Sequence, residues 1–369
     1  MIQKRIIFPL EFNHLTGGMI LSLLSLIKFL SKQEEFEVYV LASKNAEIFN
    51  LKLDIIPIKL DDDWIVSFKN PLKTLRTYFQ VRNKILELKV TENVLVVTND
   101  VGSEMIFSGF GLIPIKLSRI FVSRGGDYSG KIGFIIKNGF KSLKNIIVIS
   151  NRQKKVIQNI GYPVNKINLI HNGIFSEVTT KYKFNKNQEI RLGIIGYINS
   201  NKNQILAVKA LSVLIKNGYS IKLFVYGVAY VDSDKVYQKL LFEKINELCV
   251  VEHVVFKGFI NNQPRIYNNI DILLSCSLSE GFGRTIIEAM SFGIPCVGLL
   301  ESGGLLDIIT NNYNGLLIKN DEFELVNAID KICSDSVFRE MISENSIITY
   351  KEKFTEEIMR QNYLNFLLK

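Results

Sequence analysis

Short apolar runs alternate along this chain with longer stretches in which apolar residues recur every three or four positions. In the first half, the short runs predict strands over residues 5–8, 37–41, 93–97, 120–123 and 146–150. In the second half, they predict strands over residues 190–195, 221–225, 251–256, 270–274 and 295–298. The longer stretches predict helices, among them 19–30, 72–88, 204–216, 235–248, 284–292 and 322–332. Because strands that alternate with helices are typical of parallel sheets covered on both faces, the sequence predicts an α/β protein with two Rossmann-like domains.

A polar segment separates the two predicted domains. Residues 179–188 are rich in Lys and Asn, which is typical of a linker. We therefore expect domains over residues 1–178 and 179–353, and two domains is the usual number for a chain of 369 residues. Phe354, Ile358, Asn362 and Phe366 follow at four-residue spacing, so residues 354–369 are expected to form an amphipathic terminal helix.

The cysteine and aspartate residues do not point to a metal. The four cysteines form no CxxC pair, and two of them, Cys276 and Cys296, fall in apolar runs, so we expect buried, reduced thiols. The aspartates at 61–63 and at 232 and 234 fall at predicted turns and helix starts, where Asp commonly bonds backbone N–H groups. Neither a metal site nor a disulfide is expected.

The positive charge of the chain is concentrated in one segment. Residues 116–155 hold ten Lys and Arg residues and one acid, Asp127, while the net charge of the whole chain is +9. Within this segment Lys alternates with apolar residues over 131–141, which indicates contact with an anionic membrane surface. A solvated basic face is the alternative. Nucleic-acid binding is not expected, because the sequence has no recognition motif and no repeated aromatic platform.

No apolar run predicts a transmembrane helix. The longest, 19–30, is too short to cross a bilayer and contains Lys28. The apolar start of the chain ends at Glu11, too early for a signal peptide, and predicts a first strand instead. We therefore expect a cytoplasmic protein that contacts the inner face of the cytoplasmic membrane peripherally.

The clearest chemical pattern is a glycine-rich turn between two carboxylates. Glu280, Gly281, Phe282 and Gly283 precede the helix predicted at 284–292, and Glu288 lies inside that helix. The first N–H groups of a helix and its dipole attract an anion, while carboxylates accept hydrogen bonds from hydroxyls. A phosphate with hydroxyls on either side describes a nucleotide sugar. The alternative is a capped helix in which the second Glu has no function.

Two further turns follow predicted strands, at the end of a parallel sheet where ligands bind. Gly17 and Gly18 stand at a predicted helix start, where they would let a phosphate approach the backbone. The turn that begins at Gly196 contains Lys202, whose ammonium can reach a pyrophosphate. We expect a donor bound between the domains to contact all three turns, and backbone groups near Phe259 to read its base.

With these residues the chain resembles the retaining family 4 glycosyltransferases of the GT-B fold, over nearly its full length. The resemblance rests on Glu280 to Gly283 with Glu288, and on the segments 293–297 and 172–174. It is supported by Gly17 with Gly18, the Lys202 turn, residues 314–316 and the terminal helix. It implies an N-terminal acceptor-binding domain and a C-terminal nucleotide-sugar-binding domain that face each other across a cleft, with the last helix returning to the N-terminal domain.

The resemblance also implies roles for the donor-site residues. By it, Glu280 contacts hydroxyls of the donor sugar, Glu288 takes the ribose hydroxyls, and Lys202 binds the diphosphate. The turn that holds sugar and phosphate then consists of Gly281, Phe282, Gly283, Arg284 and Thr285.

The chain departs from the family pattern in two places. Tyr197 stands where the family usually has an Arg for the diphosphate, and Arg284 is our candidate to supply that charge. The His that family members commonly place near the reacting carbon is also missing. Arg124 and Asp127 are the residues we expect on the acceptor side instead, with His14 as a further candidate. The other two histidines are expected in a turn (171) and in a strand (253).

The expected activity is therefore metal-independent transfer of a hexose, with retention, from a nucleotide-diphosphate sugar to a glycan or lipid-linked acceptor. Lys202 and the helix start would stabilise the departing diphosphate, whose oxygen would take the acceptor proton. Neither a cofactor nor a metal enters this scheme, and bacterial surface polysaccharide or glycoconjugate synthesis is the expected setting. The alternatives are a catalytically silent nucleotide-sugar-binding subunit and another GT-B enzyme, such as a sugar-nucleotide epimerase or a phosphorylase.

Overall fold

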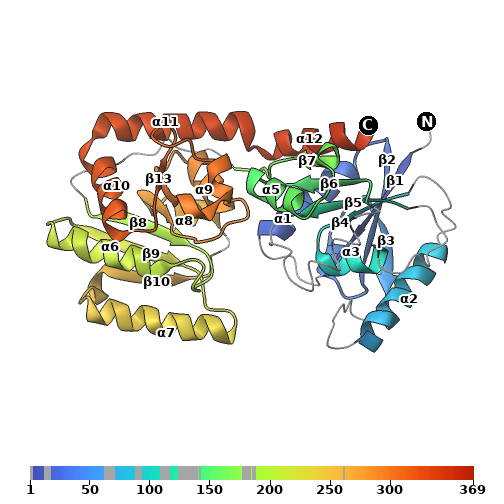
Figure 1. Ribbon diagram of the computed structural model, residues 1–369, viewed down its shortest axis with the longest axis horizontal. Helices are drawn as coiled ribbons and strands as arrows, with labels where there is room; N and C mark the ends of the chain where they lie inside the picture. The colour runs from blue at the N-terminus through green and yellow to red at the C-terminus, as the bar shows by residue number, and fades with distance from the viewer. Residues whose placement is uncertain are drawn as a thin grey trace. The chain divides into compact units, whose positions relative to one another are not determined.

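The computed structural model describes residues 3–11, 18–61, 71–87, 94–108, 117–123, 140, 143–176, 184, 188–260 and 262–369. The chain forms two compact units, each built on a parallel sheet with helices around it (Figure 1). The first unit comprises Met1–Asn172 and Met359–Lys369, and the second comprises Gly173–Ile358. The predicted boundaries were 178 and 353. The alternation of strands and helices predicted from the apolar pattern is confirmed in both units.

The first unit contains a seven-stranded sheet in the order β3-β2-β1-β4-β5-β6-β7. Its strands are all parallel: β1 Lys4–Pro9, β2 Phe36–Ser43, β3 Ile56–Leu60, β4 Val94–Thr98, β5 Leu117–Ser123, β6 Asn145–Val148 and β7 Ile167–Leu169. Its helices are α1 Gly18–Leu30, α2 Pro71–Glu87, α3 Val101–Ser108 and α5 Asn151–Asn159. Side chains alternate between two cores, since Ile6 and Phe8 of β1 lie in one and Ile7 lies in the other.

The terminal helix α12, Glu356–Leu368, packs on the first of these cores. Met359, Tyr363 and Leu367 are its buried residues, so the apolar stripe lies one residue later than the predicted 358-362-366 spacing. The reason is that this later stripe holds no amide, whereas the predicted stripe would have buried Asn362.

The second unit contains a six-stranded sheet in the order β10-β9-β8-β11-β12-β13. Its parallel strands are β8 Ile190–Ile195, β9 Ile221–Tyr226, β10 Val254–Gly258, β11 Ile272–Ser275, β12 Cys296–Leu299 and β13 Leu316–Ile318. Its helices are α6 Gln204–Lys216, α7 Asp232–Glu247, α8 Gln263–Tyr267, α9 Arg284–Ser291, α10 Glu322–Ser334 and α11 Ser336–Lys353. Three short 3-10 turns complete it: η3 Val251–His253, η4 Leu300–Ser302 and η5 Gly304–Asp307.

Two strands of the second unit begin two or three residues later than predicted. Residues 251–253 form the 3-10 turn η3, so His253 precedes β10 and its Nδ1 lies 3.0 Å from the carbonyl oxygen of Ile221. Strand β11 begins at Ile272 because Asp271 turns its carboxylate to Arg191, at 2.7 Å and 3.0 Å. Apolar pattern alone did not separate these residues from the strands that they precede.

The four cysteines are free thiols, and Asp234 caps a helix. Cys276, Cys296 and Cys333 are buried free thiols, Cys249 is exposed, and burial raises the pKa of Cys276 to about 12. Asp234 accepts hydrogen bonds from the N–H groups of Tyr230 and Val231 at the start of α7, as the capping interpretation predicts. In the part of the chain that the structure describes, no group of three His, Cys, Asp or Glu residues is placed to hold a metal ion. None of the described helices is long and apolar enough to cross a membrane.

Candidate functional site

The loops after β8 and β11 meet at the topological switch point of the second sheet. These strands are neighbours, but the chain leaves β8 toward β9 and leaves β11 toward β12. Loops that diverge in this way open a crevice at the carboxyl edge of a parallel sheet. The turn at Gly196 and the turn at Glu280 therefore come together, although they lie far apart in sequence.

Asn201 joins these two loops. Its side-chain amide donates to the carbonyl of Ser279 (2.9 Å) and its oxygen accepts from the N–H of Ser279 (3.0 Å). The N–H of Leu278 donates to the carbonyl of Asn201 (2.8 Å). Three hydrogen bonds to one residue fix the position of Lys202, the next residue, relative to Glu280. Asn201 could not be identified from the sequence, because only the folded chain shows its partners.

Lys202 and Glu280 form an ion pair at the centre of the site. The Lys202 Nζ lies 2.6 Å from Glu280 Oε2, and about a fifth of each side chain is exposed (22%). The aliphatic part of Lys202 packs over Gly196, where an added Cβ would lie only 2.9 Å from the Lys202 Cε. Gly196 also has a φ of 139°, which strains any residue with a side chain, so the backbone at this position requires glycine.

The turn from Glu280 to Gly283 rests on the segment 302–305. Glu280 donates its N–H to the carbonyl of Ser302 (2.9 Å) and accepts from the N–H of Gly304 (3.1 Å). An added Cβ on Gly304 would lie 2.5 Å from the Glu280 oxygen and 2.7 Å from backbone atoms of Gly281 and Phe282. The turn is thus packed backbone against backbone. The adjacent glycines 303 and 304 were a signal for this support that the sequence analysis did not use.

Helix α9 starts at this turn with an N-terminus that no side chain caps. Gly283 is its N-cap residue, with a φ of 109°, and an added Cβ there would lie 2.3 Å from Leu305. The Phe282 side chain is buried edge-on against Phe354, with ring centroids 5.9 Å apart. Phe282 therefore anchors the turn, while the backbone around it faces the crevice end of the sheet.

Arg284 and Tyr267 both bind Glu288. The Arg284 Nε lies 2.7 Å from Glu288 Oε1, and the Tyr267 hydroxyl donates to Glu288 Oε2 (2.8 Å) and lies 3.3 Å from the carbonyl of Thr285. Burial and the nearby Glu288 raise the pKa of Tyr267 well above its usual value, which keeps its hydroxyl as a donor. Arg284 was our candidate to supply charge to the diphosphate, whereas in the structure it pairs with Glu288. Tyr267 was missed, since it lies on a different helix.

The other predicted donor residues have exposed side chains. Tyr197 lies with its ring 5.9 Å from that of Tyr230, and its carbonyl accepts a hydrogen bond from the buried Gln204 side chain (2.9 Å). Phe259 follows β10 and is 66% exposed. Neither position carries a positive charge, so Lys202 and Arg284 are the cations among the predicted donor residues.

Most predicted residues of the first unit lie outside the described residues. These are Gly17, Arg124, Asp127 and His14; Gly18 is described as the first residue of α1. The structure adds a pair of carboxyl groups instead, Glu11 and Asp100, which follow β1 and β4 at the carboxyl edge of the sheet. Burial, and then a hydrogen bond with Asp100, raise the pKa of Glu11 to about 8. The Asp100 carboxylate also accepts from the N–H and hydroxyl of Ser103, both at 2.6 Å.

This pair predicts a pH-dependent stability. The native chain keeps a proton on Glu11 up to a pKa of about 8, whereas the unfolded chain releases it near 4.5. The stabilisation is therefore complete below pH 4.5 and is lost as the pH rises to about 8. Asp100→Asn should lower the pKa of Glu11 and flatten the fall of the melting temperature between pH 6 and 8. An unchanged slope would show that the two carboxyl groups do not interact.

The chain is similar to known glycosyltransferases. Residues 177–349 match the family model described as glycosyl transferases group 1. The chain is 23% identical over 354 residues to the capsular polysaccharide biosynthesis glycosyltransferase CapM of Staphylococcus aureus, with 90% of each chain covered. It is 26% identical to a poly(ribitol-phosphate) alpha-N-acetylglucosaminyltransferase of the same species, over 69% of this chain and 50% of that one.

Solved structures resemble the chain over nearly its full length. HepE of Anabaena, in a complex with UDP and glucose, has a TM-score of 0.78 at 17% identity, with 99% of each chain covered. A sucrose-phosphate synthase of Thermosynechococcus elongatus has a TM-score of 0.79 at 16% identity, with 99% of this chain and 98% of that one covered. These likenesses give the chain the GT-B fold. The match of residues 177–349 to the group 1 family model, together with the glycosyltransferase relatives, identifies the chain as a glycosyltransferase.

Proposed function

We propose that this glycosyltransferase takes its sugar from a nucleotide-diphosphate sugar and transfers it with retention at the anomeric carbon. The observation that carries the proposal is the Lys202–Glu280 ion pair beside the uncapped start of α9. A diphosphate at this helix start would meet backbone N–H groups, the helix dipole and the Lys202 ammonium. Lys202 would then release Glu280 and bind the diphosphate. Glu280 would accept hydrogen bonds from the sugar hydroxyls.

Glu288 is suited to the ribose. Arg284 and Tyr267 hold its carboxylate in one orientation, with one donor on each oxygen. An ionised carboxylate has about four acceptor positions, so ribose hydroxyls can be bound in addition to these donors. Because the HepE structure holds UDP, a uridine nucleotide is the first donor to test.

The site needs positive charge where the diphosphate departs. Lys202 and the backbone N–H groups of the Gly281–Thr285 turn supply it, fixed in position before the reaction. We therefore expect no metal or cofactor requirement. A leaving phosphate oxygen takes the proton of the acceptor hydroxyl on the face from which the diphosphate departs, which leaves the anomeric configuration unchanged.

The acceptor is proposed from the relatives. The names of CapM and of the ribitol-phosphate transferase refer to capsular polysaccharide and to poly(ribitol phosphate), which are bacterial surface glycans. We propose a growing surface glycan, free or linked to lipid, bound by the first unit. Arg124 and Asp127 remain our predicted acceptor residues, and Glu11 with Asp100 add a carboxyl pair at the carboxyl edge of the same sheet.

The test is release of nucleoside diphosphate from a panel of nucleotide sugars. We expect release from one of them, faster with a glycan acceptor than with water alone. A silent binding subunit would bind a nucleotide sugar without release, and an epimerase would convert the sugar while it stays attached. Either result would exclude the proposed transfer reaction.

We further propose peripheral contact between the first unit and an anionic membrane. The basic segment 116–155 that suggested this lies largely outside the described residues. Helix α2 supplies an independent observation: Leu72, Leu75 and Phe79 share one face and are 78%, 41% and 48% exposed. The same helix carries the cations Lys73, Arg76, Arg82 and Lys84 against one acid, Glu87. A lipid-linked acceptor would be presented at such a surface.

Vesicle co-sedimentation tests this contact. The chain should sediment with anionic vesicles at low salt and be released by high salt, because screening weakens an attraction of about 1 kcal/mol per basic residue. Leu72→Ser with Phe79→Ser, or charge reversal at Lys137, Lys141 and Lys144, should lower the bound fraction. Val236→Ser with Leu240→Ser, which removes exposed apolar residues of the second unit, is the matched control. Failure of the unaltered chain to sediment would rule out the contact.

A further inference from the structure

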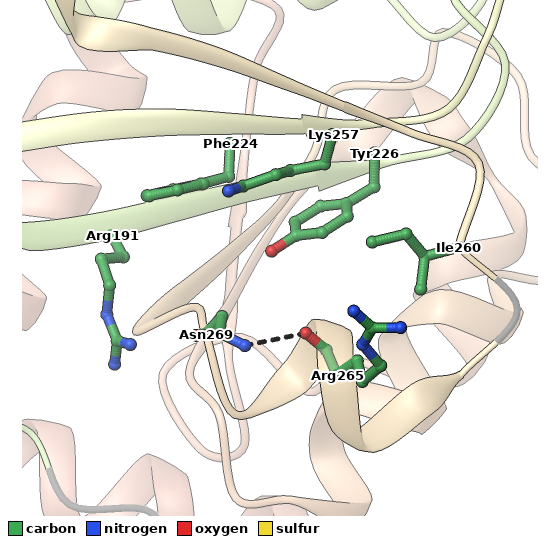
Figure 2. Close-up of a pocket in the computed structure, with 7 residues that line it drawn as sticks. All are labelled: Arg191, Phe224, Tyr226, Lys257, Ile260, Arg265 and Asn269. Carbon is green, nitrogen blue, oxygen red and sulfur yellow. Dashed lines mark hydrogen bonds between the residues drawn. The ribbon is translucent and has the colours of Figure 1, made fainter.

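A pocket of about 250 Å³ lies between α8 and the strands at the β10 edge of the second sheet (Figure 2). Seven residues line it: Arg191, Phe224, Tyr226, Lys257, Ile260, Arg265 and Asn269. None of the predicted donor-binding residues is among them. The pocket and the site described above thus share no lining residue, although both belong to the second unit.

The floor of the pocket is aromatic. Phe224 and Tyr226 are two residues apart on β9, so their side chains leave the same face of the sheet, while Leu223 and Val225 enter the core on the other face. Tyr226 is 3% exposed, and Figure 2 shows its ring directed from the strand toward Asn269 and Arg265. Two adjoining aromatic side chains suit a flat apolar ring.

The rim of the pocket is cationic. Arg191 is held by Asp271 and forms a fixed wall, with its Nη1 3.4 Å from the carbonyl of Asn268. The Lys257 Nζ lies 5.2 Å from the centroid of the Phe224 ring. Among the residues that the structure describes, no carboxylate forms an ion pair with Lys257 or Arg265. The positive charges of Arg191, Lys257 and Arg265 thus outnumber the single negative charge of Asp271. A bound anion would balance the excess positive charge.

The polar groups around the floor are mostly donors. Lys257 and Arg265 contribute N–H groups, and burial raises the pKa of Tyr226, so its hydroxyl stays protonated at neutral pH. The Asn269 amide is oriented by its own bond to the carbonyl of Arg265 (2.9 Å), drawn in Figure 2. A ligand for these groups must be rich in acceptors.

We infer that this pocket is a second ligand site, for an organic anion that consists of one ring and one phosphate or carboxylate group. The ring would contact Phe224, and the acid group would bind Lys257 and Arg265. Drug-sized ligands fill pockets of about 300–1,000 Å³, so this smaller volume excludes a whole nucleotide sugar. The inference does not depend on the proposed function, because it uses none of the donor-site residues.

The pocket and the donor site nevertheless contact the same short helix. Arg265 of α8 faces the pocket, whereas Tyr267, two residues later, points the other way and binds Glu288. Residues two positions apart on a helix point about 200° apart. A ligand in the pocket would therefore lie against the outer side of the helix that positions Glu288.

Calorimetry tests the inference. It measures the binding of phenyl phosphate, benzoate and inorganic phosphate to the full chain. We expect phenyl phosphate to bind with one site and more tightly than inorganic phosphate, which lacks the ring. Lys257→Gln with Arg265→Gln should weaken it at least about tenfold, since each charge-assisted hydrogen bond contributes at least that factor. Lys239→Gln, at an exposed position of α7, is the matched control and should have no effect.

The Lys202→Ala variant separates this pocket from the donor site. Phenyl phosphate that binds in the pocket should bind Lys202→Ala as tightly as the unaltered chain. Loss of binding in Lys202→Ala, with full binding in the Lys257 and Arg265 double variant, would place the anion at the donor site and overturn the inference. Absence of phenyl phosphate binding, or equal binding of inorganic phosphate, would overturn it as well. Each variant must unfold like the unaltered chain in the absence of ligand. A change in binding can then be assigned to the pocket or to the donor site.

Discussion

Replacement of Lys202 by Ala is expected to lower the turnover of sugar transfer by about 100- to 1,000-fold, the usual effect of removing one group that stabilises charge in the transition state. The ammonium lies 2.6 Å from Glu280 and beside the start of α9, where we place the departing diphosphate. Glu280→Gln should also lower turnover, because an amide of the same shape cannot accept hydrogen bonds from sugar hydroxyls on both of its polar atoms. Turnover is measured as release of nucleoside diphosphate in the presence of an acceptor.

The pair Lys209–Glu322 provides the control for both variants. Its Nζ–Oε distance is 3.2 Å, and it joins α6 to α10. Lys209→Ala and Glu322→Gln remove the same charges from the same unit and should leave turnover within about twofold, since exposed ion pairs contribute little to stability. Equal losses in the two pairs, or none in either, would contradict the assignment of Lys202 and Glu280 to the donor site.

Gly304→Ala is expected to lower both stability and turnover. The added Cβ would lie 2.5–2.7 Å from backbone atoms of Glu280, Gly281 and Phe282, which cannot move aside as a flexible side chain would. Overpacking of this kind costs about 1–3 kcal/mol of unfolding free energy. Displacement of the turn would also separate Glu280 from Lys202. Urea unfolding gives the stability change, and nucleoside diphosphate release gives the change in turnover.

Gly218→Ala is the control for this substitution. Gly218 has a φ of 87° but no heavy atom within 4 Å of an added Cβ, so the substitution strains the backbone without a clash. It should destabilise the chain by about 1 kcal/mol and leave turnover unchanged. Full turnover in Gly304→Ala would show that the position of the glycine-rich turn does not matter for the reaction.

The fold followed from the sequence because parallel strands buried on both faces are continuous apolar runs. The runs at 190–195 and 221–225 appear in the structure as β8 and β9 with almost the same bounds. The meeting of Lys202 with the Glu280 turn was likewise predictable, because both follow strands of one sheet. Residues 251–253 and 270–271 could not be separated from the strands that follow them, because the apolar pattern does not show where the hydrogen bonds of a strand begin.

The supports of the site could not be predicted in the same way. Asn201 binds Ser279, and Gly304 packs on Glu280, through contacts between loops that only the folded chain brings together. Tyr267 reaches Glu288 from another helix, and Glu11 lies beside Asp100, which follows another strand. Each partner is an ordinary residue in its own segment. Functional residues at the ends of strands could be predicted from the sequence. Contacts between side chains of distant segments could be identified only in the structure.

A structure of the chain with a bound nucleotide sugar tests the central claim most directly. We predict that the diphosphate lies at the start of α9 and bonds to Lys202, which then no longer contacts Glu280. Glu280 should accept hydrogen bonds from the sugar hydroxyls, and Glu288 should accept them from the ribose while it keeps Arg284 and Tyr267. A nucleotide sugar bound elsewhere, with the Lys202–Glu280 pair intact, would contradict the account.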